Sequence, residues 1–448
     1  MADHYQSKIA AKMAAADGRS YDDLGSSDDL GSFGDLGSFG GLGPGDLAIA
    51  EWQALGLELP DVAAMRAYRL ERIRHELGVR DCAAALLTDP LNVRYATDST
   101  NMQLWCTHNP VRYVFVATEG PVILFDFYGS AHLSDHLQLI DEVRAGTSFF
   151  YFASGDGTPA AAKRWAAEIA ELVKRHGGGS RRLAVDKVDP LGTRALEDLD
   201  LSLIDGQEVT ELARAIKSPD ELRAMRCAIA ACETGMAVMQ AHLEPGITEQ
   251  DLWSHLHAEN IKRGGEWIET RLLASGQRTN PWFAECSSKA IKAGEIVAFD
   301  TDLIGPYGYC ADISRTWLCA GQPTPRQKMM YQLAAEQIAH NTALLRPGLG
   351  FREFAEQSFP LAEAYRPNRY SVVIHGVGLC GEYPHIPYAE DAEHAYDDAF
   401  ETGMTVCVES YVGEVGGPDG IKLEQQVLIT ETSAELLSPY PLEPDFLS

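Results

Sequence analysis

Between residues 51 and 205, short apolar runs alternate with longer stretches in which apolar residues recur every three or four positions. The short runs have the length of buried strands, and the longer stretches have the period of an amphipathic helix. The pattern predicts strands at residues 83–87, 113–117, 122–126 and 183–186, and helices at residues 62–77 and 159–176. This alternation indicates an α/β domain, which we place at residues 47–211.

A different pattern begins at Ser218, where helix-start signals precede blocks of apolar residues. Ser218-Pro219-Asp220-Glu221 has an N-cap serine, a proline in the first turn and a glutamate three residues after the cap, which is the capping box. Similar signals at Thr248 and at residues 324–327 precede further helices. Apolar strands follow each helical block. The pattern predicts a second domain at residues 212–448, of the α+β class, with helices covering a largely antiparallel sheet.

Residues 1–46 contain few large apolar residues. The tetrapeptide Asp-Leu-Gly-Ser begins at Asp23 and recurs at Asp29 and Asp35, with a period of six residues. Such a segment cannot bury a core, which predicts a flexible Gly/Asp-rich arm. The open alternative is that its leucines bind a partner or pack on the body of the protein.

Composition restricts the class of protein. A chain of 448 residues exceeds the roughly 150 residues of an ordinary domain and predicts two or three domains. The net charge of −28 argues against a nucleic-acid partner, and the nine cysteines show no paired spacing that would indicate disulfides or a zinc site. No apolar run approaches the roughly 18 residues of a membrane span, and no signal-peptide pattern is present. We therefore expect a cytoplasmic protein without a membrane partner.

Six potential metal ligands lie in or beside short apolar runs in the last third of the chain: Asp300, Asp302, Asp312, His375, Glu409 and Glu424. Acidic residues are rarely placed in apolar strands unless their charge is compensated. No run of Lys or Arg accompanies them, so the buried carboxylates would need a cation. Two divalent ions would satisfy that charge.

The spacing of the aspartates predicts a hairpin. Asp300 ends one predicted strand, turn residues follow at 305–308, and a returning strand at 309–318 carries Asp312. The hairpin would bring Asp300 or Asp302 near Asp312. A carboxylate-rich set with one histidine suits Mn, Fe, Co or Zn and tends to hold two ions.

The order of these six residues, together with Asp312-Ile313-Ser314-Arg315-Thr316 and His375-Gly376-Val377-Gly378, resembles the pita-bread metallohydrolase superfamily. That superfamily contains methionine aminopeptidase, prolidase, aminopeptidase P and creatinase. The resemblance extends from about residue 51 to the C-terminus. It implies a creatinase-like N-terminal domain before a pita-bread catalytic domain, and a homodimer.

One branch of the superfamily is closer. The peptidases usually have a single aspartate at the position of Thr301, whereas here Asp300 and Asp302 flank it, as in dimethylsulfoniopropionate lyases of the DddP type. Residues 95–105, 263–276 and 421–424 resemble those lyases too. The resemblance implies that the six ligands hold two divalent transition-metal ions, with iron expected and Mn, Zn or Co as alternatives. It also implies a small zwitterionic substrate.

The chain departs from both branches after His375. The lyases have an aspartate, proposed to be the general base, six residues after this histidine, where the chain has Gly381. The peptidases have a substrate-binding histidine about seven residues on, where the chain has Glu382. We therefore expect Glu382 or Tyr370 to serve as the catalytic group.

A sulfonium substrate also needs aromatic faces or carboxylates around its positive charge. The candidate substrate-binding residues are Trp105, Trp267, Trp282, Tyr309 and His385. Each aromatic residue could instead be a core residue. His385 could be a second proton-transfer group or an ordinary loop histidine between two prolines.

Three hypotheses for the function follow. The first is a metal-dependent lyase that cleaves dimethylsulfoniopropionate, or a related small zwitterion, to dimethyl sulfide and acrylate. The second is a metal-dependent Xaa-Pro dipeptidase or creatinase-type hydrolase, in which the same site would activate water. The third is a non-catalytic binding protein, against which the complete ligand set argues.

Overall fold

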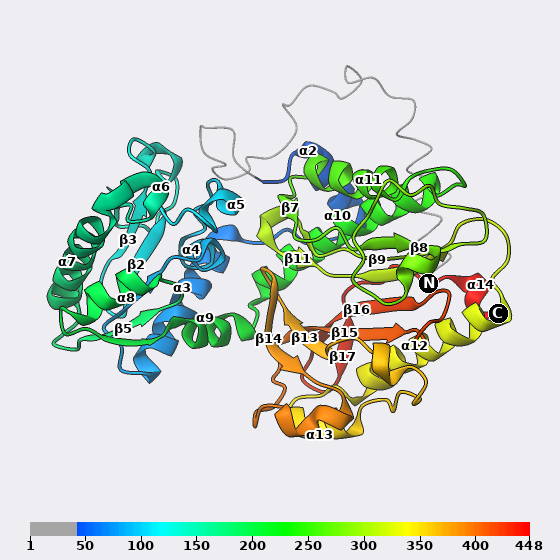
Figure 1. Ribbon diagram of the computed structural model, residues 1–448. Helices are drawn as coiled ribbons and strands as arrows, with labels where there is room; N and C mark the ends of the chain where they lie inside the picture. Colours follow the sequence, from blue (N-terminus) through cyan, green and yellow to red (C-terminus); the bar gives the residue numbers. More distant parts are fainter. Residues whose placement is uncertain (1–42) are drawn as a thin grey trace, which may run out of the picture.

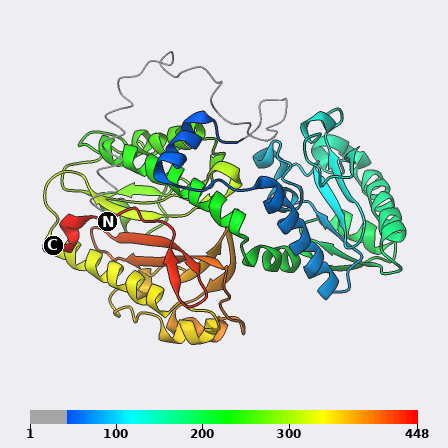
Figure 2. The same cartoon turned by 180° about the vertical axis from the view of Figure 1, so that it is seen from behind.

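Two layered units make up residues 43–448, the part of the chain that the computed structural model describes (Figure 1). Helix α9 (Gly206–Ala215) leads from the first unit to the second, as the view from behind also shows (Figure 2). The arm expected at residues 1–46 lies almost wholly outside the described residues, so its flexibility stays a prediction.

The first unit is a six-stranded mixed sheet with the order β4-β3-β2-β1-β5-β6. The pairs β1–β5, β5–β6 and β3–β4 are parallel, and β1–β2 and β2–β3 are antiparallel. The strands are β1 (Ala84–Leu87), β2 (Tyr113–Ala117), β3 (Val122–Asp126), β4 (Glu142–Ala145), β5 (Arg182–Val185) and β6 (Ser202–Asp205). Strands β1, β2, β3 and β5 were expected from the apolar runs within one residue at each end.

Helices cover both faces of this sheet. Because side chains alternate along a strand, Ala84 and Leu86 belong to one core while Ala85 and Leu87 belong to another. The first core includes Trp165 and its neighbours on α7 (Thr158–His176), and the second includes residues of α3 (Val62–Val79). The remaining helices of this unit are α4 (Pro90–Thr97), α5 (Gln103–Cys106), α6 (Tyr151–Ser154) and α8 (Pro190–Glu197).

The second unit consists of antiparallel sheets between helices. Every strand pair that the structure describes within it is antiparallel, as the sequence predicts for an α+β domain. Its small sheets have the orders β11-β10-β7 and β12-β9-β8, and its largest sheet has the order β14-β13-β15-β16-β17. The strands are β7 (Trp267–Ile268), β8 (Leu273–Ser275), β9 (Ile296–Asp300), β10 (Leu303–Ile304), β11 (Cys310–Ala311), β12 (Ser314–Leu318), β13 (Ile374–Val377), β14 (Gly381–Ile386), β15 (Thr405–Val412), β16 (Ile421–Ile429) and β17 (Ala434–Leu436).

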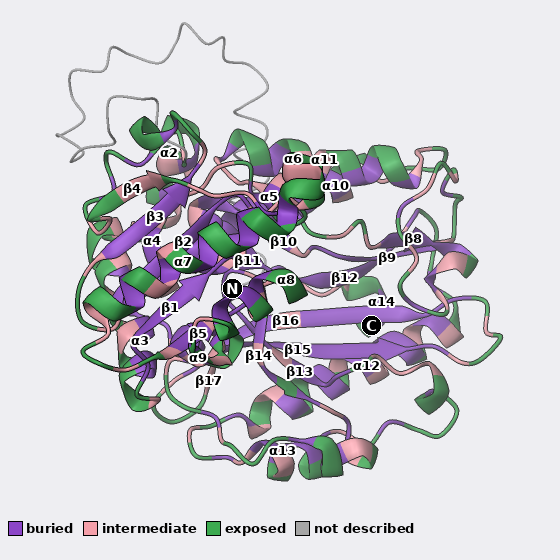
Figure 3. Cartoon of the chain, turned by 60° about the vertical axis from the view of Figure 1, so that its left-hand side comes forward, coloured by how far each residue is buried: buried purple, intermediate pink, exposed green. Residues whose placement is uncertain are grey.

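Helices cover the outer faces of these sheets, and the long strands β15 and β16 between them are buried (Figure 3). Helix α10 shares a core with β9 and β12, and α12 shares one with β15 and β16. The expected capping boxes are present: Ser218 with Glu221 begins α10, and Thr324 with Gln327 begins α12. The helices are α10 (Pro219–His242), α11 (Glu249–Lys262), α12 (Pro325–Leu344), α13 (Phe351–Gln357) and α14 (Pro444–Leu447).

One early helix packs on the later unit. Helix α2 (Asp46–Leu55) buries Trp52 against Cys227 and Ala230 of α10, and Arg263 after α11 pairs with Glu51 at 2.7 Å. Figure 1 shows α2 above the second unit, beside α11. The domain limits of 47–211 and 212–448 stay a prediction, although α2 precedes the first unit in the sequence and packs on the second.

Candidate metal centre

All six predicted ligands come together where β9 and β12 approach β15 and β16. Ligand atoms of Asp300, Asp302 and Asp312 lie within 4.8 Å of one another, as do those of Asp300, Glu409 and Glu424. The Nε2 atom of His375 lies 3.2 Å from Glu409 Oε1, 3.6 Å from Glu424 Oε1 and 3.7 Å from Asp312 Oδ2. These residues come from β9, the loop after it, the break before β12, and strands β13, β15 and β16.

Strand register explains why the glutamates meet. Glu409 on β15 is paired directly with Glu424 on β16, so both side chains point to the same face. The odd-numbered residues Leu423 and Val427 of β16 face α12 instead and belong to its core. One face of this sheet is therefore apolar core, and the other carries the ligands.

The aspartates meet through an interrupted hairpin. The predicted returning strand at 309–318 breaks at residues 312–313, between β11 and β12. Thr301 spans the break, because its hydroxyl donates to the Ala311 carbonyl at 2.8 Å and accepts the Ile313 N–H at 2.9 Å. Asp302 takes a left-handed backbone conformation, with φ of 36°. The chain therefore bends so that Asp300 and Asp302, on either side of Thr301, both lie near Asp312.

Lys422 is part of this cluster, and the sequence analysis missed it. Its Nζ lies 3.2 Å from Asp300 Oδ2 and 3.5 Å from Glu424 Oε2, and it also donates to Glu409. The side chain has no exposed surface. Lys422 lies two residues before Glu424, so strand alternation alone would have placed it on the ligand face. No run of basic residues accompanies the ligands, as the sequence analysis states, but this single lysine lies among them.

Burial and mutual repulsion dominate the electrostatics of the cluster. Burial first, and the charge of Glu424 second, raise the pKa of Asp300 and Asp312 well above the usual value. Burial also raises the pKa of Glu409. Although burial favours the neutral amine, the charges of Asp300 and Glu409 raise the pKa of Lys422 well above its usual value. The protein alone therefore does not compensate all five carboxylates.

Three buried carboxylate atoms have no hydrogen-bond partner: Asp300 Oδ1, Asp312 Oδ1 and Glu424 Oε1. Buried polar atoms are nearly always satisfied, so three such atoms in one cluster indicate that a further group belongs there. The imidazole is already oriented, because its Nδ1 donates to the Gly376 carbonyl at 2.9 Å and leaves Nε2 facing the carboxylates. The residues present fit divalent metal ions.

Several further residues support the ligands. Ser314 donates to Glu424 Oε2 at 2.7 Å, and Thr270 donates to Asp302 Oδ2. The Cys407 thiol lies in one group with ligand atoms of Asp312, His375 and Glu424, within 4.8 Å of each other. None of these three residues was expected from the sequence, since their contacts depend on the fold.

Two of the predicted substrate-binding or catalytic aromatics border the cluster. The Tyr370 ring centroid lies 4.5 Å from Lys422 Nζ, and that of Trp282 lies 5.8 Å from it. Phe283 stacks on Tyr370, with ring centroids 5.5 Å apart. Aromatic faces at these distances interact favourably with cations.

The other predicted substrate-binding residues lie elsewhere or at the margin. Tyr309 is fully buried, and its hydroxyl donates to Glu221 Oε1 at 2.8 Å between the two units. Trp105 packs against Phe127, and Trp267 packs on the edge of a core. His385 pairs with His375 across β13 and β14 and is exposed, which leaves it at the margin of the cluster.

Glu382 is committed to structural ion pairs. Its carboxylate lies 3.2 Å from Arg214 Nε and 3.0 Å from Lys217 Nζ, and it accepts the Leu379 N–H at 2.8 Å. The side chain is fully buried. These contacts hold β14 to the end of α9, so Glu382 has a role in the fold that does not require catalysis.

Another carboxylate, Glu269, lies at the edge of the cluster. Its backbone N–H donates to the Asp302 carbonyl at 3.0 Å. Although Glu269 is an exposed residue, desolvation by the surrounding chain and the charge of Asp302 raise its pKa to about 7. It lies in the stretch 263–276 that resembles the lyases, but its position near Asp302 follows only from the pairing of the chain around β7 and β10.

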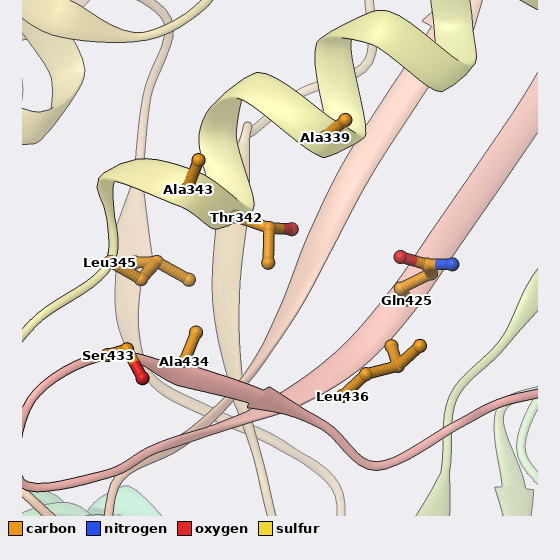
Figure 4. Close-up of a pocket in the computed structure, with 8 residues that line it drawn as sticks. All are labelled: Ala339, Thr342, Ala343, Leu345, Gln425, Ser433, Ala434 and Leu436. Atoms are coloured by element: carbon orange, nitrogen blue, oxygen red, sulfur yellow. The ribbon is translucent and has the colours of Figure 1, made fainter.

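A cavity of about 300 Å³ lies on the opposite face of the large sheet (Figure 4). It is lined by α12 and β17 residues and by Gln425, which points away from the neighbouring ligand Glu424. The cavity is therefore separate from the metal cluster.

Comparison with protein families agrees with this architecture. The sequence model of the creatinase/prolidase N-terminal domain matches residues 69–216, and that of metallopeptidase family M24 matches residues 223–431. The chain is similar in fold to a prolidase from Pyrococcus horikoshii, with a TM-score of 0.67 at 18% identity, covering 84% of this chain and 99% of that one. It is also similar to an Xaa-Pro dipeptidase from Bacillus anthracis, with a TM-score of 0.66 at 21% identity, covering 84% and 98%. The predicted pita-bread fold behind a creatinase-like domain is confirmed.

Within the described part of the chain, no helix combines the length and apolarity needed to cross a bilayer.

Two curated relatives are much more similar in sequence. The dimethylsulfoniopropionate lyase DddP of Roseovarius nubinhibens is 49% identical over 410 residues, which cover 90% of this chain and 92% of the relative. The corresponding protein of Roseobacter denitrificans is 48% identical with the same coverage. With this identity over nearly the full length of both relatives, and with the six ligand residues in one cluster, the chain belongs to the family of the dimethylsulfoniopropionate lyase DddP.

Proposed function

We propose that this protein is a metal-dependent carbon–sulfur lyase that cleaves dimethylsulfoniopropionate to dimethyl sulfide and acrylate. The observation that carries the proposal is the 49% identity to a lyase over 90% of the chain. The structure adds a buried cluster of five carboxylates and one histidine, bordered by two aromatic faces.

The ligands in this proposal are Asp300, Asp302, Asp312, His375, Glu409 and Glu424. Bound divalent ions would supply Lewis acidity, which stabilises negative charge developing on the substrate carboxylate. Iron is the metal we propose, with Mn, Zn and Co as alternatives. Elemental analysis of protein purified without added metal distinguishes them.

The elimination transfers one proton to a base and shifts two electron pairs, from the C–H bond to the new double bond and from the C–S bond to sulfur. A base removes a proton from the carbon next to the carboxylate, the carbon–carbon double bond forms, and the carbon–sulfur bond breaks with its electrons passing to sulfur. The positive sulfonium group must be held until that bond breaks. We assign this task to the faces of Trp282 and Tyr370, which lie together at one side of the cluster.

The general base cannot be residue 381, because glycine has no side chain, and Glu382 is held by Arg214 and Lys217. Burial raises the pKa of Tyr370, so its phenol stays protonated at neutral pH and serves better as a donor or an aromatic wall. Glu269 and His385 remain as groups at the margin of the cluster that could accept the proton. The variants Glu269→Gln, His385→Gln and Tyr370→Phe identify the base. The residue whose replacement lowers kcat most, at an unchanged metal content, is the base.

Head-space measurement of dimethyl sulfide, beside a dipeptide-hydrolysis assay, tests the proposed reaction. Release of dimethyl sulfide from dimethylsulfoniopropionate that requires bound metal supports the lyase. Hydrolysis of Xaa-Pro dipeptides without release of dimethyl sulfide would replace it with the metallohydrolase.

We also propose that the protein is a homodimer. Support comes from large exposed apolar side chains around α5 and α6 of the first unit, namely Met102, Leu104, Tyr128, Tyr151 and Phe152. Groups of large apolar side chains on the surface of a single subunit often mark the place where a partner subunit binds. Light scattering of the purified protein determines the number of subunits.

A further inference from the structure

Lys422 has the environment of a metal ion. The carboxylates of Asp300, Glu409 and Glu424 form one of the groups whose geometry suits a cation, and the Lys422 ammonium contacts all three. It also donates to the Ser314 hydroxyl at 2.8 Å, and Ser314 in turn donates to Glu424. The ammonium is thus held by three carboxylates and one hydroxyl group.

The charges of the cluster show what this ammonium contributes. Two divalent ions carry four positive charges, whereas the five carboxylates carry five negative charges, and the imidazole ligand is neutral. Without Lys422 the loaded centre would keep one negative charge in a largely buried place. Such a centre would repel the carboxylate of an approaching substrate.

The unpartnered oxygen atoms are not the ones that Lys422 contacts. Lys422 contacts Asp300 and Glu424 through their Oδ2 and Oε2 atoms, while the unpartnered atoms of these residues are Oδ1 and Oε1. Asp312, whose Oδ1 is also unpartnered, makes its ion pair with His375. The oxygen atoms left for metal ions are therefore different from those that bind the ammonium.

We propose that Lys422 is a built-in third cation, which makes the two-metal centre neutral and so allows it to bind a substrate carboxylate. The inference rests on the proposed function for the number of metal ions and for the anionic substrate.

The test compares charge-removing and charge-keeping variants of the metal-loaded protein. Lys422→Met removes the charge and keeps much of the side-chain length, Lys422→Gln also keeps hydrogen-bonding groups, and Lys422→Arg keeps the charge. The probes are Co²⁺, propionate and the neutral propionamide, measured by equilibrium dialysis and calorimetry. None of these measurements requires turnover, so failure of the lyase assay and failure of this inference can be told apart.

We expect Lys422→Met and Lys422→Gln to retain at least two Co²⁺ ions per chain, because removing a competing positive charge does not weaken cation binding. Their affinity for propionate should fall at least about tenfold, while the affinity for propionamide changes by less than about threefold. Lys422→Arg should keep the affinity for propionate within about threefold of the wild type.

Lys217→Met is the matched control, because Lys217 is a buried lysine paired with a carboxylate, at 3.0 Å from Glu382. It should leave the affinity for propionate unchanged. If either charge-removing variant keeps two Co²⁺ ions and wild-type affinity for propionate, the inference is overturned. It is also overturned if both variants fold but lose Co²⁺ binding, which would make Lys422 a support for the ligands only.

Discussion

Two regions of this molecule bury carboxylates, and they differ in how the charge is balanced. Between the two units, Glu221 lies with Arg69 and Tyr309, and Glu382 lies with Arg214 and Lys217. In the metal centre, five carboxylates share one lysine and one histidine. In the first region both oxygen atoms of Glu221 and of Glu382 accept hydrogen bonds, whereas the second leaves three buried oxygen atoms without a hydrogen-bond partner.

The difference separates structural from functional burial of charge. A buried carboxylate with its own Arg or Lys is satisfied and holds segments together. A group of carboxylates with too few basic partners is costly unless it binds a cation. Residue type alone does not distinguish these cases, and Glu382 shows this: its sequence position beside Gly381 suggests catalysis, while its partners indicate a structural role.

The largest effect is expected from removing a carboxylate between the two units, where each carboxylate has its own basic partner. Glu382→Ala leaves Arg214 and Lys217 buried without their carboxylate, so it should lower the free energy of unfolding by about 3–5 kcal/mol. Chemical denaturation measures this loss. Glu435→Ala, which removes a half-exposed partner of Arg226, is the control and should cost at most about 1 kcal/mol. Equal losses in both variants would remove the distinction between the pairs.

Gly381 lies between the two regions, and a side chain there tests the chemistry. Gly381 has no left-handed backbone angle, and a Cβ atom would meet only His375 Nδ1, at 3.8 Å. Gly381→Asp should therefore be tolerated, and should raise release of dimethyl sulfide by about 10²-fold if the carboxylate reaches the proton. Gly381→Asn is the isosteric control and should give no gain. An equal gain in both variants would mean that the added carboxylate does not act as a base.

In the metal centre, where the carboxylates outnumber their basic partners, loss of a carboxylate should have the opposite effect on stability. Asp312→Asn removes one carboxylate from the cluster, where burial and the charge of Glu424 disfavour its ionised form, so the chelated variant should be more stable than the chelated wild type. Denaturant unfolding in the presence of a chelator measures the difference. A clear loss of stability in this variant would show that Asp312 is balanced by the protein alone.

A smaller effect is expected from pH. Burial and neighbouring charges raise the pKa of Asp300 and Asp312 in the folded, metal-free protein. Their pKa in the unfolded chain is about 4. Between that pH and the raised pKa, the folded state binds more protons than the unfolded state. The stability of the chelated protein should therefore fall as the pH rises from 5 to 8. Melting curves should show a weaker decrease, or none, for the metal-loaded protein. If the melting temperatures of the chelated and the metal-loaded protein changed equally with pH, the claim that the carboxylates need a bound cation would be contradicted.

Much of the fold follows from local patterns. Strands β2 and β3 have the bounds that their apolar runs indicate, and α10 and α12 begin at the capping boxes that the sequence shows. These features depend on neighbouring residues only. The break of the hairpin at residues 312–313 was not foreseen, because it depends on the contacts of Thr301 across the turn.

The candidate site was predictable in its ligands but not in its surroundings. Five of the six ligands are acidic residues in or beside apolar runs, which is a local signal. The pairing of Glu382 with Lys217 spans 165 residues, and the burial of Tyr309 depends on contacts with Arg69 and Glu221. Lys422 was accessible through strand alternation, because it lies two residues before the predicted ligand Glu424 on β16.

The most direct test of the central claim measures metal content and dimethyl sulfide release on the same protein samples. The account predicts up to two transition-metal ions per chain in the wild type, release of dimethyl sulfide that disappears on chelation and returns with metal, and loss of both in Asp312→Ala/His375→Ala. Wild-type metal content in this double variant would contradict the assignment of the centre. Full metal occupancy in the wild type without any release of dimethyl sulfide would contradict the lyase.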